Sequence, residues 1–271
     1  MLALLSPAKS LDYESPLPTR KRSEPRLLDH SQRLIEVMRA KSTSEIAGMM
    51  KISDELAALN AQRYAAFSLP FTPRNARPAV LAFAGDVYQG MAARQRWDER
   101  DYTEAQKTIR ILSGLYGVLR PLDLIQPYRL EMGIRLQTDR GRNLYDYWGS
   151  TITDLLRDDL AASPGVPVVI NLASEEYAGS VRVAELGARV ITPRFEDLDG
   201  RGVRGVVGFF AKRARGQLAG WLVRNRVRTP GALKTFAAAG YRYDPASSTR
   251  DRPVFLRRFE DRTGPLAPPQ R

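Results

Sequence analysis

Apolar residues recur along this chain in two patterns: one has the 3.6-residue period of an amphipathic helix, and the other consists of short continuous runs. The helical period predicts helices over residues 25–41, 44–51, 53–66, 98–112, 143–161 and 210–227. The continuous runs are typical of buried strands and predict strands over residues 1–5, 80–84, 166–172, 189–195, 203–209 and 252–259. With neither an internal repeat nor a clear linker, this mixture predicts one compact α+β domain over residues 1–263, followed by a flexible tail at 264–271.

The stretch from Ile111 to Gly133 combines apolar residues with embedded charges. Its glycines Gly114 and Gly117 lie between apolar runs and favour a tight hairpin between two helices, whose backbone N–H groups can bind a phosphate. Four charged residues follow this hairpin: Arg120, Asp123, Arg129 and Glu131. Charges in so apolar a segment are costly to bury unless they are paired or used. Two interpretations are therefore open, a binding site or a loop held by internal arginine–carboxylate pairs.

Composition narrows the class of protein. No apolar run approaches the roughly 20 residues of a membrane-spanning helix, so no membrane partner is expected. The chain has no cysteine and a single histidine, His30, which excludes disulfides and thiolate metal sites and leaves carboxylates almost alone as metal ligands. We therefore expect no resident metal, no cofactor and a cytoplasmic location.

The distribution of charge points to an anionic partner. A net charge of +12 favours polyanions, either nucleic acid or a phosphorylated ligand. Residues 201–243 contain ten Lys and Arg residues and no Asp or Glu. Six of these residues divide between two sectors of the helix expected over 210–227: Lys212, Arg215 and Arg226 on one, and Arg213, Arg224 and Arg228 on the other. One sector can line an internal pocket while the other faces solvent. The alternative is an arginine-rich solvated helix, although solvated helices usually intersperse acidic residues.

Polar residues also follow the ends of expected strands. Lys9, Asp86 and Glu175 each occupy such a position. Ligands commonly bind beside the carboxyl ends of strands that share a sheet. Three further charged residues, Arg129, Glu131 and Lys212, also lie at the edges of apolar segments. Together the six residues predict one cleft in which three cations balance three carboxylates: Lys9, Asp86, Arg129, Glu131, Glu175 and Lys212. Lysine there can bind phosphate or act as an amine nucleophile, and the carboxylates can act as acid–base groups or hold a divalent ion. Taken singly, each residue has the alternative role of a cap, a turn or a structural ion pair.

Several longer motifs are spread over the chain: SPAKSLDYESPLPT, FAGDVYQGM, LSGLYGVLRPLDLIQPYRLEMGIRL, LYDYWG, NLASEEY, FFAKRARG and the pair Ser247-Ser248. Together they closely resemble the YaaA family of bacterial peroxide-stress proteins, from Met1 to about Phe259. The resemblance implies a cytosolic protein that protects against hydrogen peroxide by limiting loosely bound intracellular iron. It also implies DNA binding and a single-domain fold of unusual topology with a helix-hairpin-helix-like element. The chain departs from the usual pattern of that element, because Gly114-Leu115-Tyr116-Gly117 replaces Gly-apolar-Gly and Pro121 disturbs the second helix.

Two functional hypotheses follow. The first is a DNA-binding stress protein that contacts phosphates largely independently of sequence and limits iron indirectly. Its expected DNA contacts are Gly114, Gly117, Lys212, Arg213, Arg215, Arg224, Arg226 and Arg228. The second is an enzyme that acts on DNA or on a phosphorylated small molecule in the cleft of six charges. Direct iron sequestration is disfavoured, because the chain lacks cysteine and any Glu-x-x-His pair.

Overall fold

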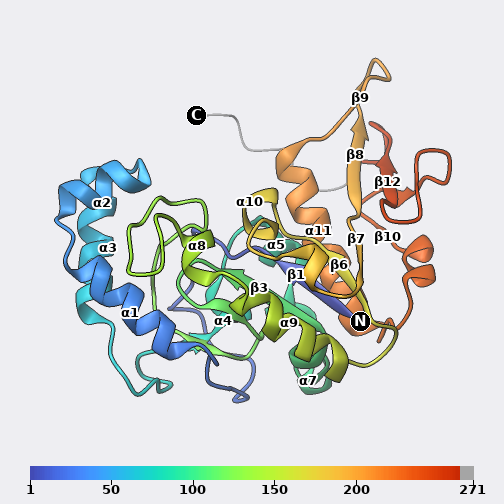
Figure 1. Ribbon diagram of the computed structural model, residues 1–271. Helices are drawn as coiled ribbons and strands as arrows, with labels where there is room; N and C mark the ends of the chain where they lie inside the picture. Colours follow the sequence, from blue (N-terminus) through green and yellow to red (C-terminus); the bar gives the residue numbers. More distant parts are fainter. Residues whose placement is uncertain (263–271) are drawn as a thin grey trace.

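The centre of the molecule is a five-stranded sheet of order β4-β3-β1-β6-β7 (Figure 1). The computed structural model describes residues 1–262, so the tail expected at 264–271 lies outside the described residues. The strands of this sheet are β1 (Leu2–Leu5), β3 (Ile109–Ser113), β4 (Gly117–Leu119), β6 (Val168–Asn171) and β7 (Arg189–Ile191). Strand β1 pairs in parallel with both β3 and β6, and β6 pairs in parallel with β7. Parallel strands are covered on both faces, and every residue of β1 is accordingly buried.

Three helices from the first quarter of the chain gather at one end of the molecule (Figure 1). They are α1 (Leu28–Arg39), α2 (Thr43–Met50) and α3 (Asp54–Ala66). Local signals fix two of their starts. Ser42 and Glu45 form a reciprocal capping box before α2, and the Ser53 hydroxyl accepts the Leu56 N–H at 3.4 Å before α3. These helices confirm the predictions at 25–41, 44–51 and 53–66.

A second five-stranded sheet, of order β10-β11-β12-β8-β9, lies at the end of the molecule away from α1–α3 (Figure 1). Its strands are β8 (Arg194–Leu198), β9 (Arg204–Gly205), β10 (Ala237–Ala238), β11 (Tyr241–Tyr243) and β12 (Val254–Arg257). The single strand predicted at 189–195 is split, so that β7 joins the first sheet and β8 the second. Pro193 lies between them and cannot donate a ladder hydrogen bond, which explains the break.

The remaining helices lie between these strands along the chain. The helices are α4 (Ala79–Ala82), α5 (Asp86–Met91), α6 (Ala93–Arg96), α7 (Glu99–Thr108), α8 (Leu144–Trp148), α9 (Thr151–Ala162), α10 (Glu175–Ala178) and α11 (Gly208–Arg224). Two 3₁₀ turns, Val183–Glu185 and Pro230–Thr235, and a ribbon of β2 (Arg77–Pro78) with β5 (Leu124–Ile125) complete them. The predicted mixed α+β class is confirmed. Within residues 1–262, no helix is both long and apolar enough to cross a bilayer.

The predicted hairpin between two helices is wrong. The helix expected over 98–112 ends at Thr108, and Gly114 and Gly117 instead stand at the turn between the antiparallel strands β3 and β4. A glycine-rich turn between apolar runs occurs both in helical hairpins and in β-hairpins. Here the parallel pairing of β3 with β1 makes residues 109–113 a strand. Gly117 has φ +67°, and a Cβ on Gly114 would lie 2.1 Å from the Leu130 carbonyl oxygen. Both glycines are buried, so this turn does not present them to a DNA backbone.

Three further predictions need correction. Residues predicted as a strand at 80–84 begin within helix α4, where alanine favours the helical state. The helix predicted over 143–161 is two helices, α8 and α9, separated at Gly149, which has φ +52°. The strand predicted at 203–209 is reduced to β9, because α11 already begins at Gly208. The predictions at 1–5, 166–172, 210–227 and 252–259 are confirmed by β1, β6, α11 and β12.

Helices α5 and α11 touch through their backbones. A Cβ on Gly216 of α11 would lie 1.8 Å from the Val87 carbonyl oxygen, and one on Gly90 of α5 would lie 2.0 Å from the Arg213 carbonyl oxygen. Gly220 faces the Met91 carbonyl oxygen in the same way, at 2.8 Å. No side chain fits between these helices, so glycine at all three positions sets how closely α11 approaches the centre of the molecule.

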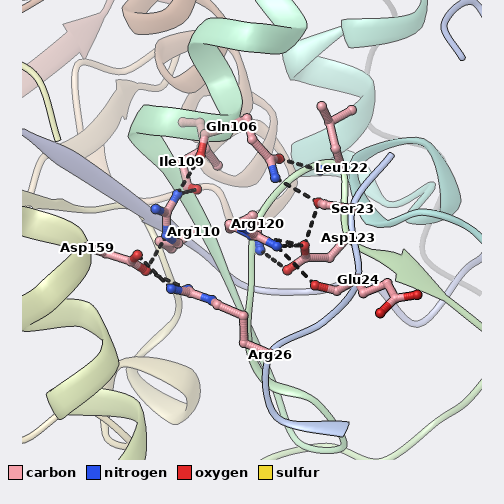
Figure 2. A network of polar contacts seen from close by, with 10 residues as sticks. All are labelled: Ser23, Glu24, Arg26, Gln106, Ile109, Arg110, Arg120, Leu122, Asp123 and Asp159. Carbon is pink, nitrogen blue, oxygen red and sulfur yellow. Dashed lines mark hydrogen bonds and ion pairs between the residues drawn. The ribbon is translucent and has the colours of Figure 1, made fainter. Parts of the chain in front are cut away.

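A network of polar side chains around the buried carboxylates of Asp159 and Asp123 ties α9, β3 and the N-terminal segment together (Figure 2). Asp159 on α9 accepts two hydrogen bonds from Arg26, at 2.8 and 2.7 Å, and one from Arg110 on β3, at 2.5 Å. Arg110 is only 4% exposed, and the Asp159 carboxylate compensates the charge of its buried guanidinium. The network thereby anchors the segment before α1 to the central sheet.

The second half of the network holds the segment after β4 (Figure 2). Asp123 is fully buried and accepts the Arg120 backbone N–H at 2.8 Å, the Arg120 Nε at 3.0 Å and the Ser23 hydroxyl at 2.6 Å. The Arg120–Asp123 pair matches the interpretation of a loop held by internal arginine–carboxylate pairs.

The α5–α11 contact yields a stability prediction. We expect Gly216→Ala to lower the free energy of unfolding by about 1–3 kcal/mol or more, because the added methyl group forces two backbones apart. Gly48→Ala on α2 is the matched control, since a Cβ there meets nothing within 4 Å and alanine is the better helix former. Urea titration of both variants measures the difference. Equal stability of Gly216→Ala and the wild type would contradict the close contact.

The Asp159 network yields a second prediction. Burial raises the pKa of Asp159, but the hydrogen bonds from Arg26 and Arg110 outweigh it and hold that pKa below its ordinary value of 3.8. A depressed carboxyl pKa contributes stability that is complete above the unfolded-state value and is lost as the pH falls through the folded-state value. We expect Asp159→Asn to cost about 3–5 kcal/mol at neutral pH and to flatten the acid limb of the stability curve.

The matched control is Asp154→Asn on the same helix. Its partner Arg157 is 52% exposed, so this surface pair contributes at most about 1 kcal/mol. Denaturant titrations from neutral to acidic pH compare the two variants, and an Asp159→Asn protein with the stability of Asp154→Asn would show that the network contributes nothing.

Candidate functional site

The segments that follow β1 and β6 meet at the carboxyl edge of the central sheet. The Ser6 hydroxyl donates to the Ser174 hydroxyl at 3.2 Å and accepts the Ser174 backbone N–H at 2.9 Å. The Tyr88 hydroxyl of α5 donates to the Ser6 carbonyl at 2.9 Å. The sheet therefore brings the Ser6–Lys9 segment, α5 and the start of α10 together, as expected for residues at the ends of neighbouring parallel strands.

Three of the six predicted cleft residues form one cluster at this edge. Lys9 Nζ lies 3.1 Å from Glu131 Oε1, and Arg129 donates to the same oxygen from Nε at 3.2 Å and from Nη2 at 2.9 Å. The Tyr64 hydroxyl donates to the Arg129 carbonyl and so fixes the backbone of that arginine. These distances bring Lys9, Arg129 and Glu131 together, three of the six residues of the predicted cleft.

A small cavity of about 70 Å³ adjoins this cluster. Tyr128, Glu176 and Tyr177 line it together with the three clustered residues. Burial raises the pKa of both tyrosine hydroxyls well above the ordinary range, so they stay neutral. Sequence reasoning missed these two tyrosines and Glu176, although Glu176 directly follows a residue that it selected.

In the described structure, the other three predicted cleft residues form no ion pair with this cluster. Asp86 is the first residue of α5, Glu175 is exposed at the start of α10, and Lys212 is exposed on α11. Within residues 1–262, none of the three has an ion pair within 4.0 Å, so the six charges do not form one neutralising network.

Helix α11 directs its basic residues to different places. Arg215 is half-buried and donates to the Ala173 carbonyl at 3.3 Å, just after β6. Burial lowers the pKa of the Arg215 guanidinium, and nearby Glu175 opposes that shift. Arg213 and Arg224 lie on another side of the helix, beside a hollow described below.

Two of the predicted DNA contacts are engaged in ion pairs. Arg226 Nη1 lies 2.6 Å from Asp101 Oδ1, and Arg228 Nη1 lies 2.5 Å from Glu104 Oε1. Both carboxylates belong to α7, and both are buried. The acids that balance this part of the basic segment therefore come from about 125 residues earlier in the chain, at separations of 125 and 124 residues.

A hollow of about 510 Å³ lies between α11, the α5–α6 region and the strands β10–β11. Arg96, Arg213 and Arg224 line it, and no Asp or Glu does. Within residues 1–262, these three arginines have no carboxylate partner within 4.0 Å. Aromatic side chains supply much of the remaining lining: Phe209, Phe210, Trp221, Phe236 and Tyr241. The hollow thus combines free positive charge with apolar ring surface.

A fourth arginine at this hollow has a structural role. Arg257 is 3% exposed, pairs with Asp197 at 2.7 Å, and lies between the rings of Phe210 and Tyr241 at 4.2 and 4.4 Å from their centroids. Sequence reasoning missed Arg96 and the aromatic lining. The only local signal was the basic pair at Arg94 and Arg96, which is followed directly by an acidic run.

These features define a mixed α/β protein with a charged sheet edge and a basic, aromatic-lined hollow. The family model described as peroxide stress protein YaaA matches residues 1–247. A UPF0246 protein of Tolumonas auensis is 54% identical over 261 residues, which cover 96% of this chain and 99% of the relative. A UPF0246 protein of Cellvibrio japonicus is 49% identical over 257 residues, which cover 95% of this chain and 98% of the relative. The chain belongs to the peroxide stress protein YaaA family.

The ion pairs of the basic segment yield a prediction. We expect Arg226→Met and Arg228→Met each to lower the free energy of unfolding by about 1–3 kcal/mol, because each leaves a buried α7 carboxylate without its partner. Arg224→Met is the matched control at the same end of α11. Its side chain is exposed, so its effect should stay within about 0.5 kcal/mol. Urea denaturation compares the three, and a uniform small effect would show that the α7 pairs are not structural.

Proposed function

We propose that this YaaA-family protein protects against hydrogen peroxide by binding DNA through the hollow lined by Arg96, Arg213 and Arg224. Binding is largely independent of DNA sequence, takes place in the cytoplasm, and limits oxidative DNA damage. The observation that carries the proposal is three arginines without a carboxylate partner in an acid-free hollow, within the described part of the chain. Family membership supports the link to peroxide stress.

The physical basis is electrostatic. Lysine and arginine that neutralise phosphates release condensed counterions from DNA, and this term supplies most of sequence-independent binding. Lys212 is exposed one residue before Arg213 and adds a further cation on the same helix. Aromatic rings beside these arginines offer surfaces on which bases or sugars can pack.

The proposal extends to iron as an indirect effect. Loosely bound iron converts peroxide to damaging radicals, and a protein bound to DNA shields the target or lowers iron at that place. Within residues 1–262, no three His, Asp or Glu side chains cluster closely enough to hold a metal ion. The support for iron limitation is the family resemblance, and the DNA contacts are proposed independently of it.

An enzyme acting at the sheet edge, on DNA or on a phosphorylated small molecule, is the second candidate function. One observation favours it: Glu131 Oε2 is buried without a hydrogen-bond partner in the described structure, beside the cavity. Polar groups in that state often belong to sites that act on a ligand.

The DNA proposal predicts a salt-dependent affinity. We expect log K for a labelled duplex to fall linearly with log salt, by about 0.9 for each phosphate contact. Replacing Arg96, Arg213 and Arg224 together by alanine should weaken binding and reduce that slope by about 2–3, measured by fluorescence anisotropy over a salt series.

The control replaces Arg74, Arg157 and Arg182 by alanine, which removes the same charge from exposed positions on other elements. This variant should retain most of the affinity. A flat salt dependence, no binding at low salt, or equal losses in both variants would contradict the proposed DNA surface. Complementation of a peroxide-sensitive strain with the same pair of variants then connects DNA binding to protection.

A further inference from the structure

The two carboxylate oxygens of Glu131 differ in their contacts. Oε1 receives both neighbouring cations, with Lys9 Nζ at 3.1 Å and Arg129 Nη2 at 2.9 Å. Oε2 is buried and has no hydrogen-bond partner within residues 1–262. Leaving a buried acceptor unsatisfied costs about 1–3 kcal/mol, and more for a charged group. A group that persists at this cost is explained most directly by a donor that arrives from outside the chain.

The space beside this carboxylate fits a small group. The cavity of about 70 Å³ has the volume of roughly two water molecules, which matches an ammonium and its adjoining carbon. Its lining grades from exposed to buried: the Lys9 side chain is 66% exposed, whereas those of Arg129 and Glu131 are 16% and 14% exposed. The mouth therefore carries a cation, and the interior carries the unused acceptor.

The charges of the lining limit the kind of ligand. Lys9 and Arg129 balance Glu131 and Glu176, whose Oε1 accepts the Gly133 N–H at 2.9 Å. A lone anion or a lone cation would disturb this balance. A ligand with one positive and one negative group preserves the balance, because its ammonium meets the Glu131 end and its anionic group meets Lys9.

We propose that this cavity binds a small zwitterion, a primary amine with a carboxylate or phosphate a few bonds away. The amine donates to Glu131 Oε2, and the anionic group contacts Lys9 Nζ at the mouth. Tyr128 and Tyr177 line the same cavity. Ser113 holds the Tyr128 hydroxyl at 2.7 Å, and Tyr64 holds the Arg129 backbone, so the site is formed before the ligand arrives.

The test uses the full chain and isothermal titration calorimetry. The probes are the twenty common amino acids, titrated singly, and O-phosphoethanolamine, which separates a carboxylate from a phosphate as the anionic group. We expect saturable binding of at least one probe. The corresponding hydroxy acid or alcohol, which lacks the amine, should bind at least about tenfold more weakly, as expected for loss of a hydrogen bond to a charged group.

Two variants locate the site. Glu131→Gln should weaken the probe by about ten- to a hundredfold, because the amine loses its charged acceptor. Lys9→Met lies at an exposed position and should weaken the probe without weakening a simple alkylamine, which has no anionic group for Lys9 to contact. The control is Lys41→Met with Glu45→Gln on α2, an exposed pair with the same 3.1 Å separation. These changes should leave probe binding as in the wild type.

Each outcome decides the proposal. Absence of binding by every probe, or equal binding by Glu131→Gln and the wild type, overturns it and leaves water as the partner of Oε2. The melting curve of Glu131→Gln shows whether this variant folds. If it does not, two measurements still test the proposal: the affinities of the amine and the hydroxy acid for the wild type, and the affinity of the probe for Lys9→Met. The DNA titration measures a different surface, so failure of either proposal leaves the other standing.

Discussion

The backbone contact between α5 and α11 controls where the charged groups of this protein lie. Gly90, Gly216 and Gly220 permit an approach that a Cβ at any of the three would block. Because α11 lies so close, its Arg215 reaches the Ala173 carbonyl at the end of β6, while Arg213 and Arg224 border the hollow on another side. A shift of this helix would move the sheet edge and the hollow together.

Pairing decides which basic residues remain available. The segment 201–243 contains no acid, and in sequence its arginines are equivalent. In the folded protein, α7 supplies Asp101 and Glu104 to Arg226 and Arg228, whereas Arg213 and Arg224 receive no carboxylate from the described residues. A buried carboxylate needs its cation, so these pairs hold the segment that follows α11 against α7. The basic residues of this segment are thus divided between those paired with carboxylates of α7 and those without a carboxylate partner in residues 1–262.

The segment after β4 shows the same division on a smaller scale. Arg120 and Asp123 form a buried structural pair, with all contacts inside the protein. Arg129 and Glu131, a few residues later, also pair, yet the carboxylate keeps one buried oxygen free beside a cavity. The first pair of this stretch therefore holds the loop, and its second pair borders a cavity.

The sequence by itself determined the mixed class, the strand β1, the helices α1 to α3 and α11, and the family, because caps, periodicity and long motifs are local signals. It also selected Lys9, Arg129 and Glu131, since charges in apolar surroundings must meet a partner. Tertiary structure decided the rest. Glycine turns serve both kinds of hairpin, so only pairing with β1 made residues 109–113 a strand. Likewise, Arg96 lines the hollow, and Arg226 and Arg228 pair with Asp101 and Glu104 of α7. These contacts join segments that are distant in sequence, so no local pattern predicts them.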